Sequence, residues 1–450
     1  MEVTSLTSPE QSIPFPGGSL RVLGARRWVT GSMSIFDFDG FRVLVDCGMT
    51  QGRDDAGPFP EDAVSVDAVL LTHGHLDHVG ALPELWTRGA KVRIYATPAT
   101  LSLATIVLED SLRLAGAKED ERRAFMKWFR KASVGVRYDL WRELGELRFA
   151  FREAGHILGS ASIEMRTSKA RVIASGDLGR QGIPILRDPF TAWDPSPAVD
   201  LVMMESTYGN RTHAPAVQMQ DELERIIHHA LQDGGHILVP AFAIGRTQTL
   251  LYHLNTLIEA GRVRNLPVAL DTPMGIRVTE VYESSRHLYD EEALALLAQG
   301  DDPLDFDQLF AVRKGGQSHD IRHLKESMLI IAGSGMCSGG RIIGHLQELL
   351  PKPETDVLFV GYQGVGTPGR AILEAAAGRA EDGRVRTVGL FGKRVPVKAA
   401  VHQLSGLSAH ADQNELASWF SAIPSVGRVV LNHGEPEAQE ALGARLAARG

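Results

Sequence analysis

Short apolar segments separated by turn residues make up the first part of the chain, and this pattern predicts β-strands. Three such segments are Leu20–Leu23, Ser34–Phe38 and Phe41–Val45. Asp39-Gly40, between the last two segments, favours a hairpin turn. Val66–Leu71 is a continuous apolar run that predicts a buried strand, and it stops at a polar cluster that begins with Thr72.

The pattern then changes to a helical period from Thr97 to about Lys131, where the segment ends in a run of basic residues. The run consists of Arg122, Arg123, Lys127, Arg130 and Lys131. Such a run is typical of a solvent-facing helix surface. Strand-like segments return at Leu147–Phe151, Ser162–Met165 and Arg171–Ser175. We therefore expect a strand-rich region with interspersed helices.

After about Ser206 the segments alternate regularly between the strand and the helix pattern. They are helix Val217–Leu231, strand His236–Pro240, helix Arg246–Ala260, strand Pro267–Leu270, strand Met328–Ala332, helix Gly340–Leu350 and strand Asp356–Tyr362. Strands that alternate with helices indicate a parallel sheet covered by helices on both faces. This region is predicted to be a separate α/β domain.

Strands resume at about Val385 and are followed by a helix at Asn414–Ile423, a strand at Val429–Asn432 and a final helix that ends at Ala448. If this part rejoins the first, the α/β region between them is an insertion whose two ends lie close together. We therefore predict a first domain of residues 1–205, an inserted domain of residues 206–375 and a return to the first domain over residues 376–450.

Composition narrows the class of protein. Lys and Arg number 47 against 55 Asp and Glu, so the net charge of −8 argues against general electrostatic attraction to polyphosphate. Cys47 and Cys337 are the two cysteines, which excludes a disulfide framework and a four-cysteine zinc site and favours a reducing compartment. A signal-peptide pattern and a long apolar run are both missing from the sequence. We expect a cytoplasmic protein without a membrane partner.

The strongest chemical signal is His73-Gly74-His75-Leu76-Asp77-His78, which offers four potential metal ligands within six residues, directly after the predicted buried strand. Imidazole with carboxylate suits zinc first and iron or manganese next. Four ligands cannot saturate two metals, and further candidates follow other strand-like runs. These are Asp46, His156, Asp177 and His433.

In that order, Asp46, the His73–His78 cluster, His156 and Asp177 resemble the successive metal motifs of the metallo-β-lactamase superfamily. Three further segments resemble motifs A, B and C of its β-CASP nuclease family: Glu205–Gly209, Ser408–Asp412 and Asn432–Glu435. That family includes RNase J, Artemis-type DNA nucleases and the nuclease subunit of the cleavage and polyadenylation specificity factor. The resemblance implies an αββα sandwich with an inserted parallel-sheet α/β domain.

The resemblance also implies residue roles. His73, His75 and His156 would hold one zinc ion, Asp77, His78 and His433 a second, and Asp177 would bridge them. Asp46 would orient ligands and water beside the metals, and Asp77 would count as catalytic as well as metal-ligating. Glu205 and His410 would form the general acid unit. A metal-bridging hydroxide would then hydrolyse RNA to 5′-phosphate and 3′-hydroxyl ends.

Three loops of the inserted domain are candidates for contact with the RNA backbone. In Gly333–Arg341, between a strand and a helix, Ser334, Gly335, Ser338 and Arg341 are the candidates. Gly364–Arg370 formally matches a dinucleotide-binding fingerprint, but a tight turn with Pro368 opening a helix explains it better, with Arg370 able to contact phosphate. Arg246 opens the helix that follows Phe242–Gly245 and is a candidate to pair with a backbone phosphate. An exposed surface arginine without such a role explains the pattern equally well.

A histidine in motif C, His433, goes with RNA-type rather than DNA-type members of the family, so single-stranded RNA is the expected partner. Endonucleolytic cleavage is favoured over 5′-exonucleolytic cleavage. Open alternatives are a 5′-exoribonuclease or DNA nuclease of the same family, a small-substrate metallohydrolase and, last, a non-catalytic scaffold. Trp28 stands where relatives usually carry an acidic residue. Oligomeric state stays open, with a homodimer as one option.

Overall fold

The computed structural model describes residues 2–4, 6, 8, 10–51, 57–213, 216–404 and 406–448. The chain forms two compact units. The first combines Met1–Thr212 with Ala409–Gly450, and the second consists of His213–Ser408. The first unit therefore draws on both ends of the chain, whereas the second is a single continuous segment between them.

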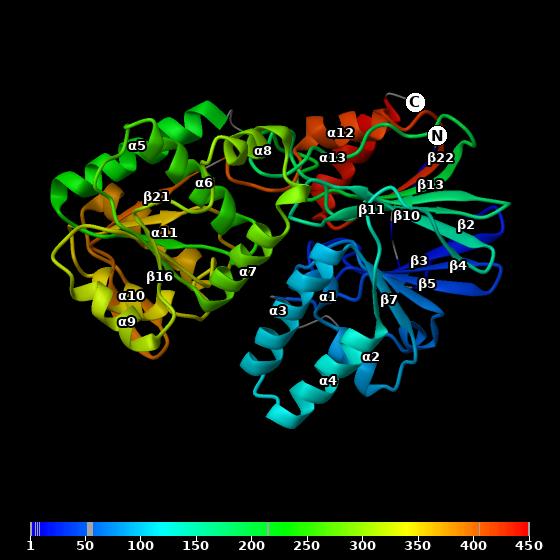
Figure 1. The fold of residues 1–450 in the computed structure, drawn as a ribbon, viewed down its shortest axis with the longest axis horizontal. Coiled ribbons are helices and arrows are strands. Elements are labelled where there is room, and N and C mark those ends of the chain that lie inside the picture. The colour runs from blue at the N-terminus through cyan, green and yellow to red at the C-terminus, as the bar shows by residue number, and fades with distance from the viewer. Residues whose placement is uncertain are drawn as a thin grey trace. The chain divides into compact units, whose positions relative to one another are not determined.

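Two seven-stranded sheets form the centre of the first unit (Figure 1). One sheet has the order β2 (Ser12–Phe15), β3 (Gly18–Gly24), β4 (Met33–Phe38), β5 (Phe41–Val45), β6 (Ala68–Leu70), β7 (Arg93–Ala96) and β8 (Ser133–Gly135). The other has the order β1 (Glu2–Thr4), β22 (Val426–Asn432), β13 (Val199–Glu205), β12 (Arg171–Ala174), β11 (Ala161–Arg166), β10 (Leu147–Glu153) and β9 (Arg142–Leu144). Buried side chains of both sheets, among them Leu20, Phe36, Phe149 and Ile163, form one shared core.

Helices cover both outer faces of this sandwich. Beside the first sheet lie α1 (Leu76–Val79), α2 (Leu82–Thr87), α3 (Pro98–Leu114) and α4 (Glu119–Ala132), with a 3-10 turn at Glu61–Ser65. Beside the second sheet lie α12 (Gln413–Ser421) and α13 (Pro436–Ala447), whose Leu416, Phe420 and Leu442 pack against Val202 and Met204 of β13. The predicted αββα sandwich is confirmed.

The predicted helical segment of this unit contains two helices. The helical period from Thr97 to Lys131 is divided between α3 and α4 rather than forming one helix. Gly116 has φ +76°, a left-handed conformation that a continuous right-handed helix cannot contain and that glycine adopts readily. The break lets the two helices pack against each other, as their contact shows.

The second unit contains a six-stranded sheet in which every described pair is parallel. Its order is β16 (Leu309–Ala311), β15 (Val268–Asp271), β17 (Leu329–Ala332), β14 (Ile237–Pro240), β18 (Asp356–Phe359) and β21 (Ala400–Gln403). The helices are α5 (Ala216–Asp233), α6 (Arg246–Glu259), α7 (Pro273–Ser284), α8 (Glu291–Ala298), α9 (Gly315–Asp320), α10 (Ile342–Leu349) and α11 (Pro368–Asp382), with 3-10 turns at Arg286–Leu288 (η2) and Ile321–His323 (η3). The predicted parallel α/β insertion is confirmed.

The second unit runs past residue 375, where the sequence pattern placed the end of the inserted domain. Strand β21 pairs with β18 over Asp356–Phe359, so it belongs to the second sheet. A hairpin of β19 (Thr387–Leu390) and β20 (Lys393–Pro396) precedes it, and Val388, Leu390 and Val395 join the core of the second unit. The pairing of β21 with β18, which lies about 40 residues earlier in the sequence, places the end of the second unit after β21.

None of the described helices has both the length and the apolar character that crossing a membrane requires.

Candidate metal centre

The predicted ligands all follow the carboxyl ends of strands in the first unit. Asp46 follows β5 and the His73–His78 segment follows β6, which are parallel neighbours in one sheet. Asp177 follows β12 and His433 follows β22, which both run parallel to β13 between them. Because parallel strands end at the same edge of a sheet, their loops bring these side chains to one place.

Two of these residues have an unusual backbone conformation. Asp46 has φ +61° and His433 has φ +48°, in the left-handed region that residues other than glycine seldom occupy. Backbone hydrogen bonds hold both, because the Asp46 N–H donates to Leu70 and the His433 N–H donates to Ala25. Such strained positions cluster at functional sites, where the surrounding structure compensates for their cost.

The first ligand group consists of His73, His75, His156 and Asp177. The His75 Nδ1 atom lies 3.0 Å from His73 Nε2 and 3.2 Å from His156 Nε2. The Asp177 Oδ2 atom lies 3.5 Å from His73 Nε2 and 3.7 Å from His156 Nε2. Four tetrahedral ligands, each about 2.1 Å from zinc, are about 3.4 Å apart, so this spacing fits one zinc ion.

The second group consists of Asp77, His78 and His433. The His78 Nε2 atom lies 3.3 Å from His433 Nε2, and Asp77 Oδ2 lies 3.5 Å from His433 Nε2 and 4.0 Å from His78 Nε2. The Asp177 Oδ2 atom lies 3.4 Å from His78 Nε2. One oxygen of Asp177 is therefore at ligand spacing from both groups, which is the position that a bridging carboxylate requires.

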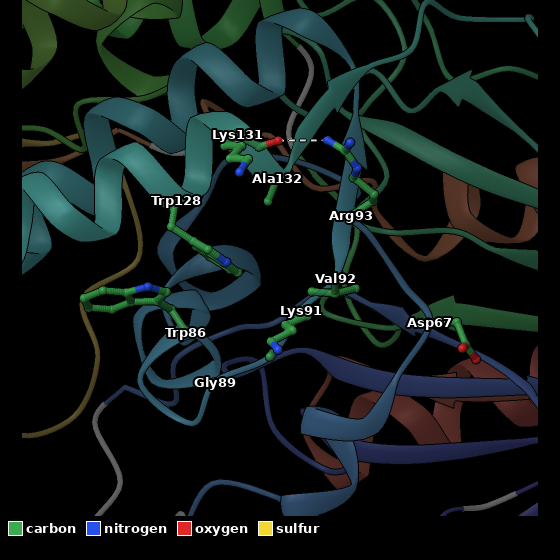
Figure 2. Close-up of a pocket in the computed structure, with 10 residues that line it drawn as sticks. Asp67, Trp86, Gly89, Lys91, Val92, Arg93, Trp128, Lys131 and Ala132 are labelled. Atoms are coloured by element: carbon green, nitrogen blue, oxygen red, sulfur yellow. Dashed lines mark hydrogen bonds between the residues drawn. The ribbon is translucent and has the colours of Figure 1, made fainter.

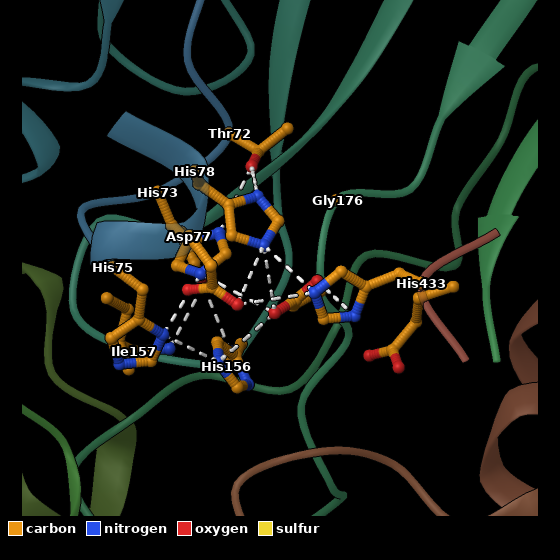
Figure 3. Close-up of polar contacts among 12 residues, drawn as sticks. Thr72, His73, His75, Asp77, His78, His156, Ile157, Gly176 and His433 are labelled. Atoms are coloured by element: carbon orange, nitrogen blue, oxygen red, sulfur yellow. Dashed lines mark hydrogen bonds and ion pairs between the residues drawn. The ribbon is translucent and has the colours of Figure 1, made fainter. Parts of the chain in front are cut away.

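A buried hydroxyl group and a buried carboxylate, those of Thr72 and Asp46, contact the Nδ1 atoms of the imidazoles, and Figure 3 shows Thr72 beside His78. The His78 Nδ1 atom lies 2.7 Å from Asp46 Oδ2, and the Thr72 backbone N–H and side-chain hydroxyl also donate to Asp46. The Thr72 hydroxyl oxygen lies 3.1 Å from His73 Nδ1. A proton held on Nδ1 by these partners leaves the Nε2 lone pair of each ring for a metal ion.

The electrostatics of the cluster suit a bound cation. Burial lowers the pKa of His73 well below its usual value and that of His75 to about 4, so both rings are neutral at pH 7. Burial also acts to lower the pKa of His78, but Asp177 and Asp46 raise it well above the usual value. Asp177 and Asp46 thus stabilise positive charge beside His78. A bound metal ion would provide that positive charge in place of a proton on the imidazole.

Glu205 and His410 form an adjoining group with Asp177. The His410 Nδ1 atom lies 3.1 Å from Glu205 Oε1 and 4.0 Å from Asp177 Oδ2. Glu205 is buried and accepts the backbone N–H groups of Leu178 and Thr207. These N–H donors hold its carboxylate in place, with one oxygen toward His410.

The predicted RNA-contacting residues lie in the second unit, and several of their polar groups are engaged there. The Arg341 guanidinium donates to Asp271 and to the carbonyls of Val312 and Arg313. Arg370 pairs with Glu374 one helical turn on, and its side chain is 42% exposed. Arg246 is the first residue of α6. Roles for these arginines in RNA binding remain predictions.

The Gly333–Arg341 loop is shaped by its own hydrogen bonds. The Ser334 hydroxyl accepts the Ser338 N–H, and the Cys337 N–H donates to the Ser334 carbonyl. Gly335 is buried against Phe242, where an added Cβ would lie 2.6 Å from the ring. Ser338 is exposed. The backbone N–H groups of Cys337 and Ser338 are therefore used within this loop. In the Gly364–Arg370 segment, Pro368 opens α11 directly after the N-cap residue Thr367, as predicted.

The first unit also contains a surface cavity of about 510 Å³ that holds none of the predicted site residues. Trp86 and Trp128 line it together with Lys91 and Arg93, and the Arg93 guanidinium donates to the Lys131 carbonyl (Figure 2). This cavity is therefore not where the candidate metal ligands gather.

Sequence reasoning missed the residues that support the ligands. Thr72 marked only the start of a polar cluster, yet it contacts Asp46, His73 and His78. The Thr207 hydroxyl lies 3.1 Å from His433 Nδ1, across 226 residues of sequence. Thr207 lies inside motif A, so its place near Glu205 could be read from the sequence, whereas its contact with His433 could not.

Three family models match the chain. They describe the metallo-beta-lactamase superfamily (residues 26–211), the Beta-Casp domain (residues 247–372) and the Zn-dependent metallo-hydrolase RNA specificity domain (residues 394–450). The first match contains the ligands from His73 to Asp177, and the third contains His410 and His433.

Curated relatives match over most of the chain. Ribonuclease TTHA0252 of Thermus thermophilus is 40% identical and covers 95% of each chain, and an RNase J-like protein of Methanocaldococcus jannaschii is 31% identical, covering 88% of this chain and 87% of the relative. Transcription termination factor FttA of Pyrococcus abyssi is 30% identical over 92% of this chain and 66% of its own length. A solved structure of an Enterococcus faecalis protein of unknown function shares the fold, with a TM-score of 0.54 at 13% identity over 94% of this chain and 95% of that one.

Proposed function

Because the chain belongs to the β-CASP nuclease family of the metallo-β-lactamase superfamily, we propose that it is a metal-dependent ribonuclease that works with two zinc ions. The position of Asp177 carries the proposal of two ions. Its Oδ2 atom lies 3.4 to 3.7 Å from imidazole nitrogens of both ligand groups. A single carboxylate oxygen at that spacing from two sets of ligands fits a shared bridge between neighbouring metals.

The donor set fits zinc. His73, His75 and His156 offer three imidazole nitrogens to one ion, and His78 and His433 offer two to the other, with Asp77 and Asp177 adding carboxylate oxygens. Imidazole with carboxylate is a usual zinc environment. When bound, two zinc ions activate water as a nucleophile and stabilise the charge on the phosphate.

Residues of the chain supply orientation around that chemistry. Asp46 and Thr72 hold His73 and His78 in the tautomer that turns Nε2 toward the centre. The buried location of these groups excludes water from the ligand atoms, and a low dielectric strengthens their interaction with charge. Asp46 therefore acts as a positioning residue.

His410, held by Glu205, is the proposed proton donor to the leaving group. Glu205 accepts a hydrogen bond from His410 Nδ1 and holds the ring in place. The second ring nitrogen is then able to pass a proton to the departing 3′-oxygen of the RNA chain. This step leaves a 3′-hydroxyl on one fragment and a 5′-phosphate on the other.

RNA is the proposed substrate class for three reasons. Motif C carries His433, and two relatives that match nearly the whole chain are called a ribonuclease and an RNase J-like protein. The match to an RNA specificity domain over residues 394–450 supports the same substrate. Internal cleavage of single-stranded RNA is the proposed mode.

Mapped cleavage products test the function. Purified wild-type chain is incubated with end-labelled single-stranded RNA and DNA, with and without a chelator, beside His75→Ala and His410→Ala variants. His228→Ala, an exposed histidine of α5, serves as the matched control. We expect chelator-sensitive internal cuts in RNA that both site variants lose and the control keeps. Products that arise only at the 5′ end would replace the endonuclease mode, and zinc-loaded protein that cuts neither polymer would overturn the function.

A further inference from the structure

A second group of potential metal ligands lies on the surface of the second unit. It consists of His319 at the end of α9, His323 in η3 and Glu348 near the end of α10. One ligand atom from each of the three lies within 4.8 Å of the others. We propose that these residues bind an additional divalent transition-metal ion, with zinc as the first candidate.

The geometry follows from how α9 continues into η3. His319 and His323 are four residues apart, one helical turn, so their rings lie on the same side, with centroids 4.8 Å apart. The His319 Nδ1 atom lies 3.9 Å from Glu348 Oε1, and His323 Nε2 lies 3.6 Å from Glu348 Oε2. These distances slightly exceed the roughly 3.4 Å of tetrahedral zinc ligands, and exposed imidazoles rotate easily over so short a distance.

Glu348 is already held in place for this role. The Arg322 Nη1 atom donates to Glu348 Oε1 at 2.5 Å and also to the Gly344 carbonyl, while Arg322 Nε donates to Ser318. The other carboxylate oxygen, Glu348 Oε2, is buried and has no hydrogen-bond partner among the described residues. A buried carboxylate oxygen without a partner is costly, and a cation facing His323 removes that cost.

The donor set selects the class of ion. Two imidazoles and one carboxylate favour zinc, copper or nickel over magnesium or calcium, which prefer oxygen ligands. The Arg322 guanidinium beside Glu348 repels a cation, and the two histidine side chains are 59% and 57% exposed. This ion is therefore bound more weakly than ions at the buried centre of the first unit, which has more ligands and more carboxylate charge.

A bound ion would connect α9 and η3 to α10, which begins directly after the Gly333–Arg341 loop. Ser318 of α9 donates to Asp271, and Asp271 also accepts hydrogen bonds from Arg341 and lies 2.6 Å from His345 of α10. The helices α9 and α10, which the ion would join, are thus already linked through Asp271 to Arg341 at the end of the Gly333–Arg341 loop. Occupancy would stiffen that support without taking part in chemistry.

Metal content measured on the full chain tests the site. Wild-type, His323→Ala and Glu348→Gln proteins are loaded with excess zinc, dialysed against buffer with limited zinc and analysed by atomic absorption, with His228→Ala as control. We expect each site variant to hold one equivalent less than wild type and the control to match wild type. A competing chromophoric chelator should release that equivalent at about tenfold lower concentration than the rest.

The comparison with wild type makes the result independent of nuclease activity and of the number of ions at the buried centre. Both site variants replace side chains that are partly exposed, and circular dichroism of each variant checks that it is folded. Equal zinc content in wild type and both variants would overturn the site and leave a polar contact between His323 and Glu348 as the account of the cluster.

Discussion

Two buried polar clusters in the first unit show how the same carboxylate group serves different ends. Glu164 of β11 is 1% exposed, and three guanidinium groups surround it: Arg152, Arg166 and Arg171 donate to its oxygens at 2.5 to 3.1 Å. Asp177 is also nearly inaccessible, but its ion-pair partners are the imidazoles of the metal centre. Glu164 has its compensating charge in three arginine side chains, whereas Asp177 converges with imidazole groups that can serve as metal ligands.

The difference separates structural from functional burial. The charge of a carboxylate enclosed by arginines is neutralised by those arginines. Removal of the carboxylate leaves buried positive charges without a counter-charge. A carboxylate among imidazole lone pairs is compensated by an ion that the protein has to acquire. Glu153 illustrates a third solution, because burial raises its pKa to about 8 and the group stays protonated, although Arg187 acts to lower that pKa.

The largest expected effect is at Asp177. Asp177→Asn removes the proposed bridging charge while preserving side-chain size, so we expect RNA cleavage to fall by about 10³-fold or more, because the metals supply several kcal/mol of transition-state stabilisation. Thermal unfolding of the metal-free protein should change little. Single-turnover cleavage rates and zinc content measure the effect, with Asp110→Asn at a partly exposed position of α3 as control. Full activity in the variant would remove the contrast with Glu164.

The opposite outcome is expected at Glu164. Glu164→Ala leaves three guanidinium groups without their shared acceptor, and loss of one member of a buried ion network costs about 3–5 kcal/mol of unfolding free energy. Denaturant unfolding monitored by circular dichroism measures the loss. Cleavage per folded molecule should stay near wild type, since Glu164 contacts none of the ligands in the described structure. A variant with normal stability and lost activity would reverse the assignment.

Asp46 should show an intermediate effect, because it acts through His78 and Thr72. Asp46→Asn weakens the hold on the His78 tautomer, and such supporting residues typically contribute about 10 to 100-fold to metal affinity or activity. Zinc titration and the pH profile of cleavage together detect a positioning role. An activity loss that excess zinc cannot partly restore would instead indicate direct contact with the substrate.

The smallest effect concerns pH and Glu153. Its folded-state pKa of about 8 lies above that of an unfolded glutamate, so the folded state holds a proton that the unfolded state has lost between about pH 4.5 and 8. Stability therefore falls as pH rises through this window, by about 1 to 2 kcal/mol for a partly exposed group. Glu153→Gln should flatten that fall in melting-temperature scans from pH 5 to 8. An identical slope in both proteins would place the titration elsewhere.

The sequence alone predicted what depends on neighbouring residues. The parallel insertion follows from local alternation of strands and helices, whereas the αββα sandwich was implied by the resemblance of the metal motifs, and both are confirmed. The His73–His78 segment drew attention because four ligands fall within six residues, on one loop. The helix N-caps at Thr367 and Asp412 also depend on neighbouring residues. The side chain of each N-cap accepts a hydrogen bond from a backbone N–H group two or three residues further along the chain.

Only the tertiary structure decided which distant residues meet. The proximity of Asp177 to both histidine groups, the contact between Glu205 and His410 across 205 residues, and the pairing of β21 with β18 all join segments that no local pattern connects. Arg341 looked available for phosphate in sequence, but its guanidinium bonds to Asp271. The surface cluster needed Glu348 from α10 to complete a histidine pair on α9 and η3. Local hydrogen bonding and periodicity are encoded over a few residues, whereas the direction of a side chain depends on charges and cavities assembled from the whole fold.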